Sequence, residues 1–187
     1  MKLNLGCAYN HMQDSENVDI DPRCKPDRLV NLEKFPWPWA DESVDEICMF
    51  HSLEHLGADP NVFLGVMREL YRVLVPGGQV HIAVPHHRHD NYVNSPTHVR
   101  PVTGITLQQF SLAWNKQTRE EGFANETFAQ DLGVDFKITE NRLVIAKPWW
   151  EKFQRGLITK EELEFACASY WNVIEECHLT IEKVPLT

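Results

Sequence analysis

Two short apolar segments near the start of the chain, each stopped by turn residues, restrict the fold more than any other feature. The first segment runs from Leu3 to Leu5 and ends at Gly6, and the second runs from Asn17 to Ile20 and ends at Asp21-Pro22. Their length and composition are those of buried strands. The polar residues between them favour a loop, so we expect the chain to begin with two strands that no helix joins.

The clearest predicted helix lies further along. Asp59 can cap it, Pro60 suits its first position, and Pro76-Gly77-Gly78 is expected to end it. Its apolar stripe consists of Phe63, Val66, Met67, Leu70, Tyr71 and Leu74. Further strands are predicted at Arg28 to Leu32, Val44 to Phe50 and Gln79 to Val84. This alternation predicts an α/β, Rossmann-like fold with a mostly parallel sheet and helices on both faces.

The pattern weakens beyond Pro85. We expect a His-rich loop as far as Pro101 and a helix at Thr106 to Asn115. The remaining predicted elements are a hairpin over Phe136 to Ala146 that turns at Glu140-Asn141, a helix around Lys160 to Cys177, and an antiparallel C-terminal strand at Leu179 to Val184.

Composition limits the class of protein. The chain has 187 residues and a net charge of -9, which suits one domain and makes nucleic acid an unlikely partner. No apolar run approaches the roughly 18 residues that a membrane span needs, so no membrane association is expected. Five scattered cysteines without a CxxC pair, and a start at Met1-Lys2-Leu3 with no room for an export signal, predict a cytoplasmic protein.

The turns after the first two strands carry the most informative residues. A side chain at Gly6 would prevent a ligand from approaching the backbone closely. A carboxylate at the end of the second strand can accept hydrogen bonds from both hydroxyls of a ribose; Asp19 is the first candidate and Asp21 the alternative. This arrangement suits a nucleoside bound at the strand ends of an open sheet.

Several later segments follow in a characteristic order. They are Glu33-Lys34-Phe35-Pro36-Trp37-Pro38-Trp39-Ala40-Asp41-Glu42-Ser43-Val44-Asp45-Glu46-Ile47, then His51-Ser52-Leu53-Glu54-His55-Leu56, then Glu69-Leu70-Tyr71-Arg72-Val73-Leu74-Val75-Pro76-Gly77-Gly78. Together with Leu3-Asn4-Leu5-Gly6-Cys7-Ala8 and Val18-Asp19-Ile20, this series resembles the class I S-adenosylmethionine-dependent methyltransferases. The resemblance runs from Leu3 to about Pro85. Pro96-Thr97-His98-Val99-Arg100-Pro101 extends it to a smaller, single-domain branch.

The resemblance implies one methyltransferase-like domain over residues 1–187. Residues 1–85 form its cofactor-binding half, and residues 86–187 supply a substrate-facing loop, the sheet edge and the C-terminal helix. The implied cofactor is S-adenosyl-L-methionine, and the implied reaction is methyl transfer to a small-molecule, sugar or protein acceptor that the sequence does not identify. The implied cofactor-binding residues are Asn4, Gly6, Cys7, Ala8, Asp19, Asn31, Leu32, Phe50 and His51, with Glu33 as an alternative near the adenine.

Two departures from the family pattern keep other functions open. Ala8 stands where the family has a second glycine, and Asn10 where it has a third, with a short polar crossover following them. A catalytically inactive binding or scaffold protein is therefore one alternative. A dinucleotide-dependent oxidoreductase is a weaker one, because the GxGxxG spacing is absent.

Histidines are the candidate catalytic bases. His51, His86 and His89 are the predicted catalytic residues, with His87, Asp90 and His98 as further candidates near the strand ends. The spacing within His86 to Asp90 matches no known metal motif, so no metal is predicted. Structural roles are expected for Glu54 and His55, at the start of the next helix and packed beneath the sheet. Residues 120–135 are where an acceptor lid could lie, and the oligomeric state is not predicted.

Overall fold

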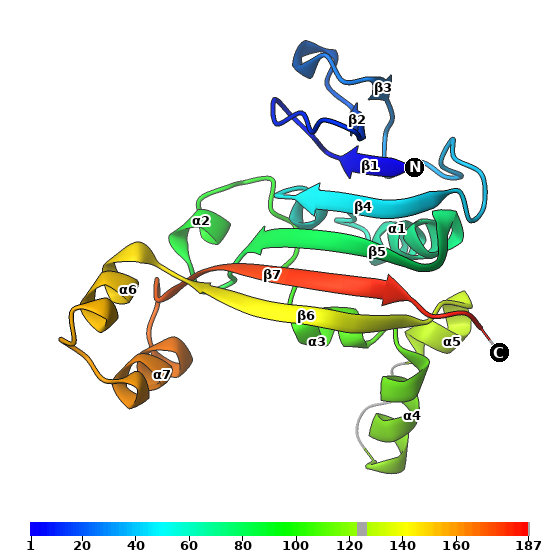
Figure 1. Cartoon of the computed structure of the whole chain (residues 1–187). Coiled ribbons are helices and arrows are strands. Elements are labelled where there is room, and N and C mark those ends of the chain that lie inside the picture. Colours follow the sequence, from blue (N-terminus) through cyan, green and yellow to red (C-terminus); the bar gives the residue numbers. More distant parts are fainter. Residues whose placement is uncertain (123–126, 187) are drawn as a thin grey trace.

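One seven-stranded sheet, in the order β3-β2-β1-β4-β5-β7-β6, forms the centre of the molecule. A computed structural model describes residues 1–122 and 127–186 (Figure 1). The strands are β1 (Lys2–Leu5), β2 (Glu16–Asp19), β3 (Arg28–Leu29), β4 (Val44–Phe50), β5 (Leu74–Pro85), β6 (Phe136–Ile145) and β7 (Ile174–Lys183). Among these strands, β7 pairs antiparallel with both β5 and β6, and the other pairs are parallel. The predicted Rossmann-like fold with a mostly parallel sheet and an antiparallel C-terminal strand is confirmed. Helices on both faces are also predicted, but the connections from β1 to β4 contain only the short 3₁₀ turn η1 (Pro22–Cys24), so one face of the sheet has no helix layer among the described residues.

The core lies between the sheet and one layer of helices. Leu3 on β1, Ile47 on β4, Val80 on β5 and Ile181 on β7 form a continuous row of paired, fully buried residues. The helix α1 (Pro60–Val73) packs its apolar stripe on this face, and α1, α3 (Gly104–Gln108) and α5 (Phe128–Leu132) lie behind the sheet in Figure 1. Burial of these alternate side chains holds the strands in register.

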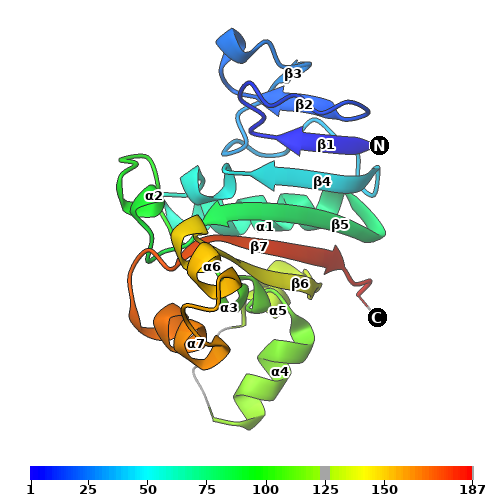
Figure 2. The same ribbon diagram turned by 60° about the vertical axis from the view of Figure 1, so that its left-hand side comes forward.

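The opposite side of β4, β5 and β7 is more polar. Its side chains include Glu46, His81 and Thr180, which alternate along the strands with the core residues. In Figure 1 no described helix crosses this side. The helices α6 (Lys147–Gln154) and α7 (Lys160–Ser169) lie beyond one end of β6 in Figure 1 and come to the front in Figure 2. They form a small apolar cluster of their own.

Local signals place α1 correctly at its start. Asp59 accepts a hydrogen bond from the Asn61 N–H at 2.9 Å, and Pro60 occupies the first turn, both as predicted. The predicted end is wrong: α1 ends at Val73, and Pro76-Gly77-Gly78 belong to β5. A shift of register between β4 and β5 accommodates these three residues, so they form an irregular strand instead of a helix terminus.

Three predicted elements of the second half are wrong in form. Residues 136–145 form one strand and no hairpin, because β6 pairs with β7 along its length as an edge strand. Residues 174–177 belong to β7, so the predicted helix ends at Ser169. The helix predicted at 106–115 is divided into α3 and α4 (Leu112–Glu120), because Phe110 enters the core and Ser111 caps a new helix.

Smaller features complete the chain. The His-rich loop contains the single helical turn α2 (Asp90–Val93). Two short 3₁₀ turns are η1 (Pro22–Cys24) and η2 (Leu53–His55). Part of the segment considered as a lid, residues 123–126, lies outside the described residues. Within the described ranges, none of the helices has the length and apolar character that crossing a membrane requires.

Candidate functional site

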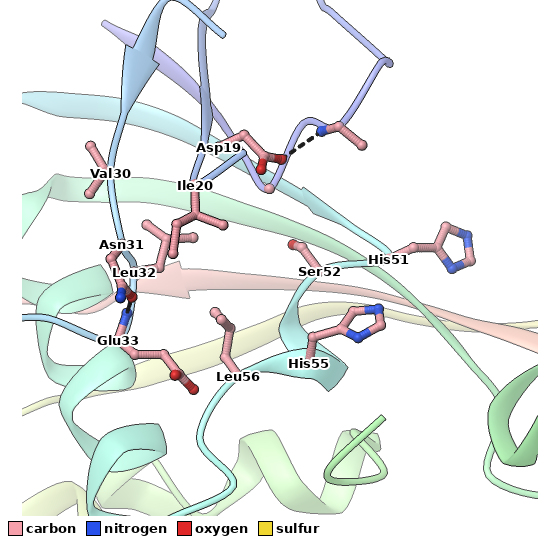
Figure 3. Close-up of a pocket in the computed structure, with 12 residues that line it drawn as sticks. Asp19, Ile20, Val30, Asn31, Leu32, Glu33, His51, Ser52, His55 and Leu56 are labelled. Carbon is pink, nitrogen blue, oxygen red and sulfur yellow. Dashed lines mark hydrogen bonds between the residues drawn. The ribbon is translucent and has the colours of Figure 1, made fainter. Parts of the chain in front are cut away.

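A cleft of about 380 Å³ opens at the carboxyl ends of β1 and β4, where the strand order changes direction. Open α/β sheets bind their ligands at this switch point. The residues that line this first cleft are Gly6, Ala8, Asp19, Ile20, Val30, Asn31, Leu32, Glu33, His51, Ser52, His55 and Leu56 (Figure 3). Most of the lining is apolar, and a few polar groups interrupt it.

The turn after β1 has the close approach that the sequence indicates. Gly6 adopts a φ of +71°, and a β-carbon there would lie 2.5 Å from Cβ of Ser52. Only glycine therefore fits this position without displacement of β4 and its following residues. Ala8 also has a positive φ of 44°, and its N–H donates to Asp19 Oδ2 at 2.8 Å. This hydrogen bond holds the strained turn against the end of β2.

Asp19 presents its carboxylate at the cleft. One oxygen accepts from the Ala8 N–H, and the other accepts from the Asp21 N–H at 2.9 Å. A carboxylate oxygen has two acceptor sites, so each retains one for a ligand. The alternative, Asp21, does not line the cleft, and its carboxylate is held by the side chain of Arg23. The geometry favours Asp19.

A second cleft adjoins the first. Its lining consists of His51, Glu54, His55, Pro85, Asn91, Asn94, Ser95, Pro96 and His98, so His51 and His55 belong to both clefts. Amide, hydroxyl and imidazole groups dominate this lining. The two clefts thus share a wall of two histidines that follow β4.

His51 is held between two carboxylates. Its Nε2 lies 3.2 Å from Glu176 Oε1 on β7, and its Nδ1 lies 3.7 Å from Glu54 Oε1. The residue has a positive φ of 53°, a strained conformation for a non-glycine residue that is often found at functional sites. The ring is half exposed, so it can contact a ligand in either cleft.

Glu54 lies behind the histidines and has no solvent contact. Neither of its carboxylate oxygens has a hydrogen-bond partner among the described residues, and burial raises its pKa to about 7. The Oγ of Ser52, in the lining of the first cleft, is likewise buried without a partner there. Unsatisfied buried polar groups are rare and mark positions where a ligand can supply the missing bonds.

Comparisons with known proteins agree with this arrangement. Residues 12–82 match the family model of a methyltransferase domain. The chain has the fold of the class I methyltransferases, and residues 12–82 are similar to that family. Among solved structures, it is similar to an S-adenosylmethionine-dependent methyltransferase from Archaeoglobus fulgidus, with 16% identity, a TM-score of 0.64, and coverage of 97% of this chain and 85% of the other.

Two further structures have the same fold. One is an S-adenosylmethionine-dependent methyltransferase from Methanosarcina mazei, with 14% identity, a TM-score of 0.54, and coverage of 99% of this chain and 92% of that one. The other is the cyclase SpnF, with 15% identity, a TM-score of 0.54, and coverage of 98% and 74%. No curated protein matches the chain. A cyclase on this fold illustrates that the fold alone does not determine the reaction.

A methyltransferase domain implies S-adenosylmethionine as cofactor, and the first cleft has groups that fit it. Gly6 lets the turn after β1 pass close to Ser52, where a β-carbon would clash. Ser52 has a free hydroxyl, and Asp19 has free acceptor sites. Ile20, Leu32 and Leu56 point toward one another across the cleft and provide apolar surface for a base (Figure 3).

Six of the predicted cofactor residues meet in this cleft, and three do not. Those that meet are Gly6, Ala8, Asp19, Asn31, Leu32 and His51. Asn4 is buried and donates to Asn17 Oδ1 at 2.9 Å, Cys7 is buried beside it, and Phe50 is exposed outside the lining. Asn4 and Cys7 therefore support the turn from below.

Sequence reasoning did not propose Ile20, Val30, Ser52, His55 and Leu56 as lining residues. Ile20 follows Asp19 directly and is 63% exposed, which is unusual for an isoleucine. Its side chain is exposed because it forms part of the apolar lining of the cleft. The sequence predicts a structural role for His55 beneath the sheet, but η2 brings it to the wall of both clefts. The sequence signal that could have indicated this position is that His55 follows the predicted site residue His51 by four residues.

The predicted catalytic residues His86 and His89 line neither cleft. His86 is only 5% exposed, stacks on His87 with ring centroids 4.2 Å apart, and accepts the Arg88 N–H on Nδ1. His89 accepts the Asn91 N–H and caps α2. Of the three predicted bases, the geometry favours His51.

Burial of His86 predicts a pH-dependent stability. Desolvation first, and then the neighbouring positive groups, lower its pKa to about 4 from an ordinary 6.5. Between these values the unfolded chain binds a proton that the folded chain does not, so stability should fall as pH falls from about 6.5 to 4. We expect a loss of about 3 kcal/mol from this group. Urea unfolding at several pH values should show a shallower dependence in His86→Asn, and equal slopes would contradict the assignment.

Proposed function

We propose that the chain binds S-adenosylmethionine in the first cleft and transfers its methyl group to an acceptor in the second cleft. The observation that carries this proposal is the shared wall of the two clefts, formed by His51 and His55. A methyl group presented along this wall from the first cleft faces an acceptor in the second. In-line alignment of this kind supplies much of the acceleration of a methyl transfer.

The residues of the first cleft have distinct proposed roles. The free acceptor sites of Asp19 bind the ribose hydroxyls, and the apolar side chains of Ile20, Leu32 and Leu56 pack on the adenine. Gly6 and Ala8 let the methionine portion lie against the backbone. Asn31 and Glu33 remain candidates for bonds to the edge of the adenine.

His51 is the proposed general base for a hydroxyl acceptor. Bound S-adenosylmethionine supplies a methyl group on a positively charged sulfur. In a transfer to a hydroxyl group, His51 Nδ1 would take up the hydroxyl proton. Glu176 faces Nε2 at 3.2 Å and stabilises the positive ring that results.

The second cleft favours a polar acceptor. Asn91, Asn94 and Ser95 contribute amide and hydroxyl groups, which suit a sugar, a polar small molecule or a polar protein side chain. The net charge of -9 disfavours nucleic acid. Five free cysteines favour a reducing compartment, and we propose the cytoplasm as the location.

Labelled S-adenosylmethionine tests the proposal directly. Methyl transfer to a panel of hydroxylated acceptors should be reduced about 10²-fold in His51→Ala, because a positioned base contributes at least that factor. Cofactor affinity should fall much less than the rate of transfer, because Asp19 and the apolar lining provide the other contacts. His11→Ala removes an exposed histidine outside both clefts and should retain full activity.

Two outcomes would oppose the proposal. Equal activity of His51→Ala and the wild type would exclude His51 as the base. Failure of the wild type to bind either S-adenosylmethionine or S-adenosylhomocysteine in calorimetry would remove the enzyme function and favour the inactive binding or scaffold protein.

A further inference from the structure

Three potential metal ligands converge at the inner wall of the second cleft. Glu54, His55 and His98 each bring one ligand atom to within 4.8 Å of the other two. His98 Nε2 lies 3.8 Å from Glu54 Oε1, which is too far for a hydrogen bond. Ligands of a tetrahedral Zn²⁺ with bonds of about 2.1 Å lie about 3.4 Å apart, so small side-chain rotations would close the site.

Hydrogen bonds fix both imidazoles in the form that binds metals. His98 Nδ1 lies 2.7 Å from the Tyr92 carbonyl oxygen, and His55 Nδ1 lies 3.1 Å from the Thr97 carbonyl oxygen. A carbonyl only accepts, so each Nδ1 carries the proton and each Nε2 keeps its lone pair. Metal-binding histidines characteristically donate their second ring N–H to a backbone carbonyl in this way.

Glu54 provides the second, independent observation. Its side chain is 1% exposed, and both oxygens lack a hydrogen-bond partner among the described residues. His51 and His98 face it at 3.7 and 3.8 Å, with no bond from either. A buried carboxylate without partners is costly, and a cation between it and the histidines would satisfy it.

We propose that Glu54, His55 and His98 bind a divalent transition-metal cation in the second cleft. Two neutral imidazoles and one carboxylate suit Zn²⁺, which then retains an open position for water or an acceptor oxygen. The second cleft lies open beside the site through His98, Asn94 and Ser95. The cation site depends on these contacts alone, and only its use in methyl transfer rests on the proposed function.

The histidines and the aspartate of His86 to Asp90, whose spacing matches no known metal motif, take no part in this site. His86 and His89 line neither cleft, and their ring nitrogens accept backbone N–H groups. The ligands instead come from η2 and from the loop after α2, which are separated by more than forty residues and meet only in the fold.

Zinc titration of the chelator-treated full chain, without S-adenosylmethionine, tests the site. We expect one Zn²⁺ per chain by elemental analysis and a rise in melting temperature on binding. Glu54→Gln keeps the shape of the side chain and should weaken the Zn²⁺ affinity by at least about 10²-fold, as should His98→Asn. Substitution with Co²⁺ should give the absorption bands of a low-coordinate site, and both variants should lose them.

Matched controls keep the result interpretable. His11→Asn removes an exposed imidazole elsewhere and should bind Zn²⁺ as the wild type does, which measures adventitious binding. The melting temperature of metal-free Glu54→Gln reports whether that variant is folded. Absence of stoichiometric Zn²⁺, or equal affinity in the wild type and both variants, would overturn the proposal. Because no cofactor is present, loss of S-adenosylmethionine binding leaves this result unaffected.

Discussion

Replacement of Asp19 by alanine is expected to weaken S-adenosylmethionine binding by about 10³-fold. The carboxylate retains two acceptor sites at the cleft, and a hydrogen bond to a charged group contributes about 1.5–3 kcal/mol. Loss of two such bonds corresponds to two to four powers of ten in the dissociation constant. The substitution also removes the acceptor of the Ala8 N–H, which loosens the turn after β1. Calorimetric titration with S-adenosylmethionine and S-adenosylhomocysteine measures the effect.

Asp21→Ala is the matched control for this substitution. It lies two residues further on, contacts Arg23, and does not line the first cleft. Its cofactor affinity should stay within about threefold of the wild type. Equal losses of cofactor affinity in the two variants would show that the net negative charge, and not a specific hydrogen bond, binds the ligand. An unchanged affinity in Asp19→Ala would contradict the assignment of Asp19 to the ribose.

Local chemistry made the first half of the fold predictable. The requirement for Gly6 follows from a turn that no side chain can enter, and Asp59-Pro60 marks a helix start through a cap and a fixed φ. The polar crossover from Asn10 to Asn17 contains no helix, as expected, because Asn17 Oδ1 binds Asn4 Nδ2 and the Met12 N–H instead. These signals act over a few residues and are readable in the sequence.

Long-range pairing made the second half less predictable. Glu140 and Asn141 favour a turn locally, but they lie on the exposed edge strand β6, where polar residues are tolerated and β7 supplies the hydrogen bonds. Ile174 to Cys177 has a helical pattern that the same pairing overrides. In the site, Glu54 shows no unusual local signal, and its burial beside His98 depends on the folded loop.

Arg72→Ala is expected to destabilise the fold by about 3–5 kcal/mol, because it leaves a buried carboxylate without its partner. Glu69 is 5% exposed and accepts from Arg72 at 2.9 and 2.7 Å and from the Trp37 N–H. Arg72 also donates to the carbonyl oxygens of Trp37 and Trp39, which are distant in sequence. Burial alone would raise the pKa of Glu69, but the bonds from Arg72 and Trp37 lower it below its ordinary value.

Urea unfolding above pH 6 measures this loss, and Arg68→Ala is its control. Arg68 lies on the exposed side of the same helix, so its removal should change the unfolding free energy by less than about 0.5 kcal/mol.

The contribution of Arg72 should also depend on pH. Because the lowered pKa of Glu69 stabilises the fold only above the pKa of Glu69 in the unfolded chain, the Arg72 contribution should diminish as pH falls below about 4. Glu69→Gln combined with Arg72→Ala completes a cycle that isolates the pair. If Arg72→Ala lowered the unfolding free energy by less than about 1 kcal/mol, water would be replacing the guanidinium. The Glu69–Arg72 pair would then not stabilise the loop that carries Trp37 and Trp39.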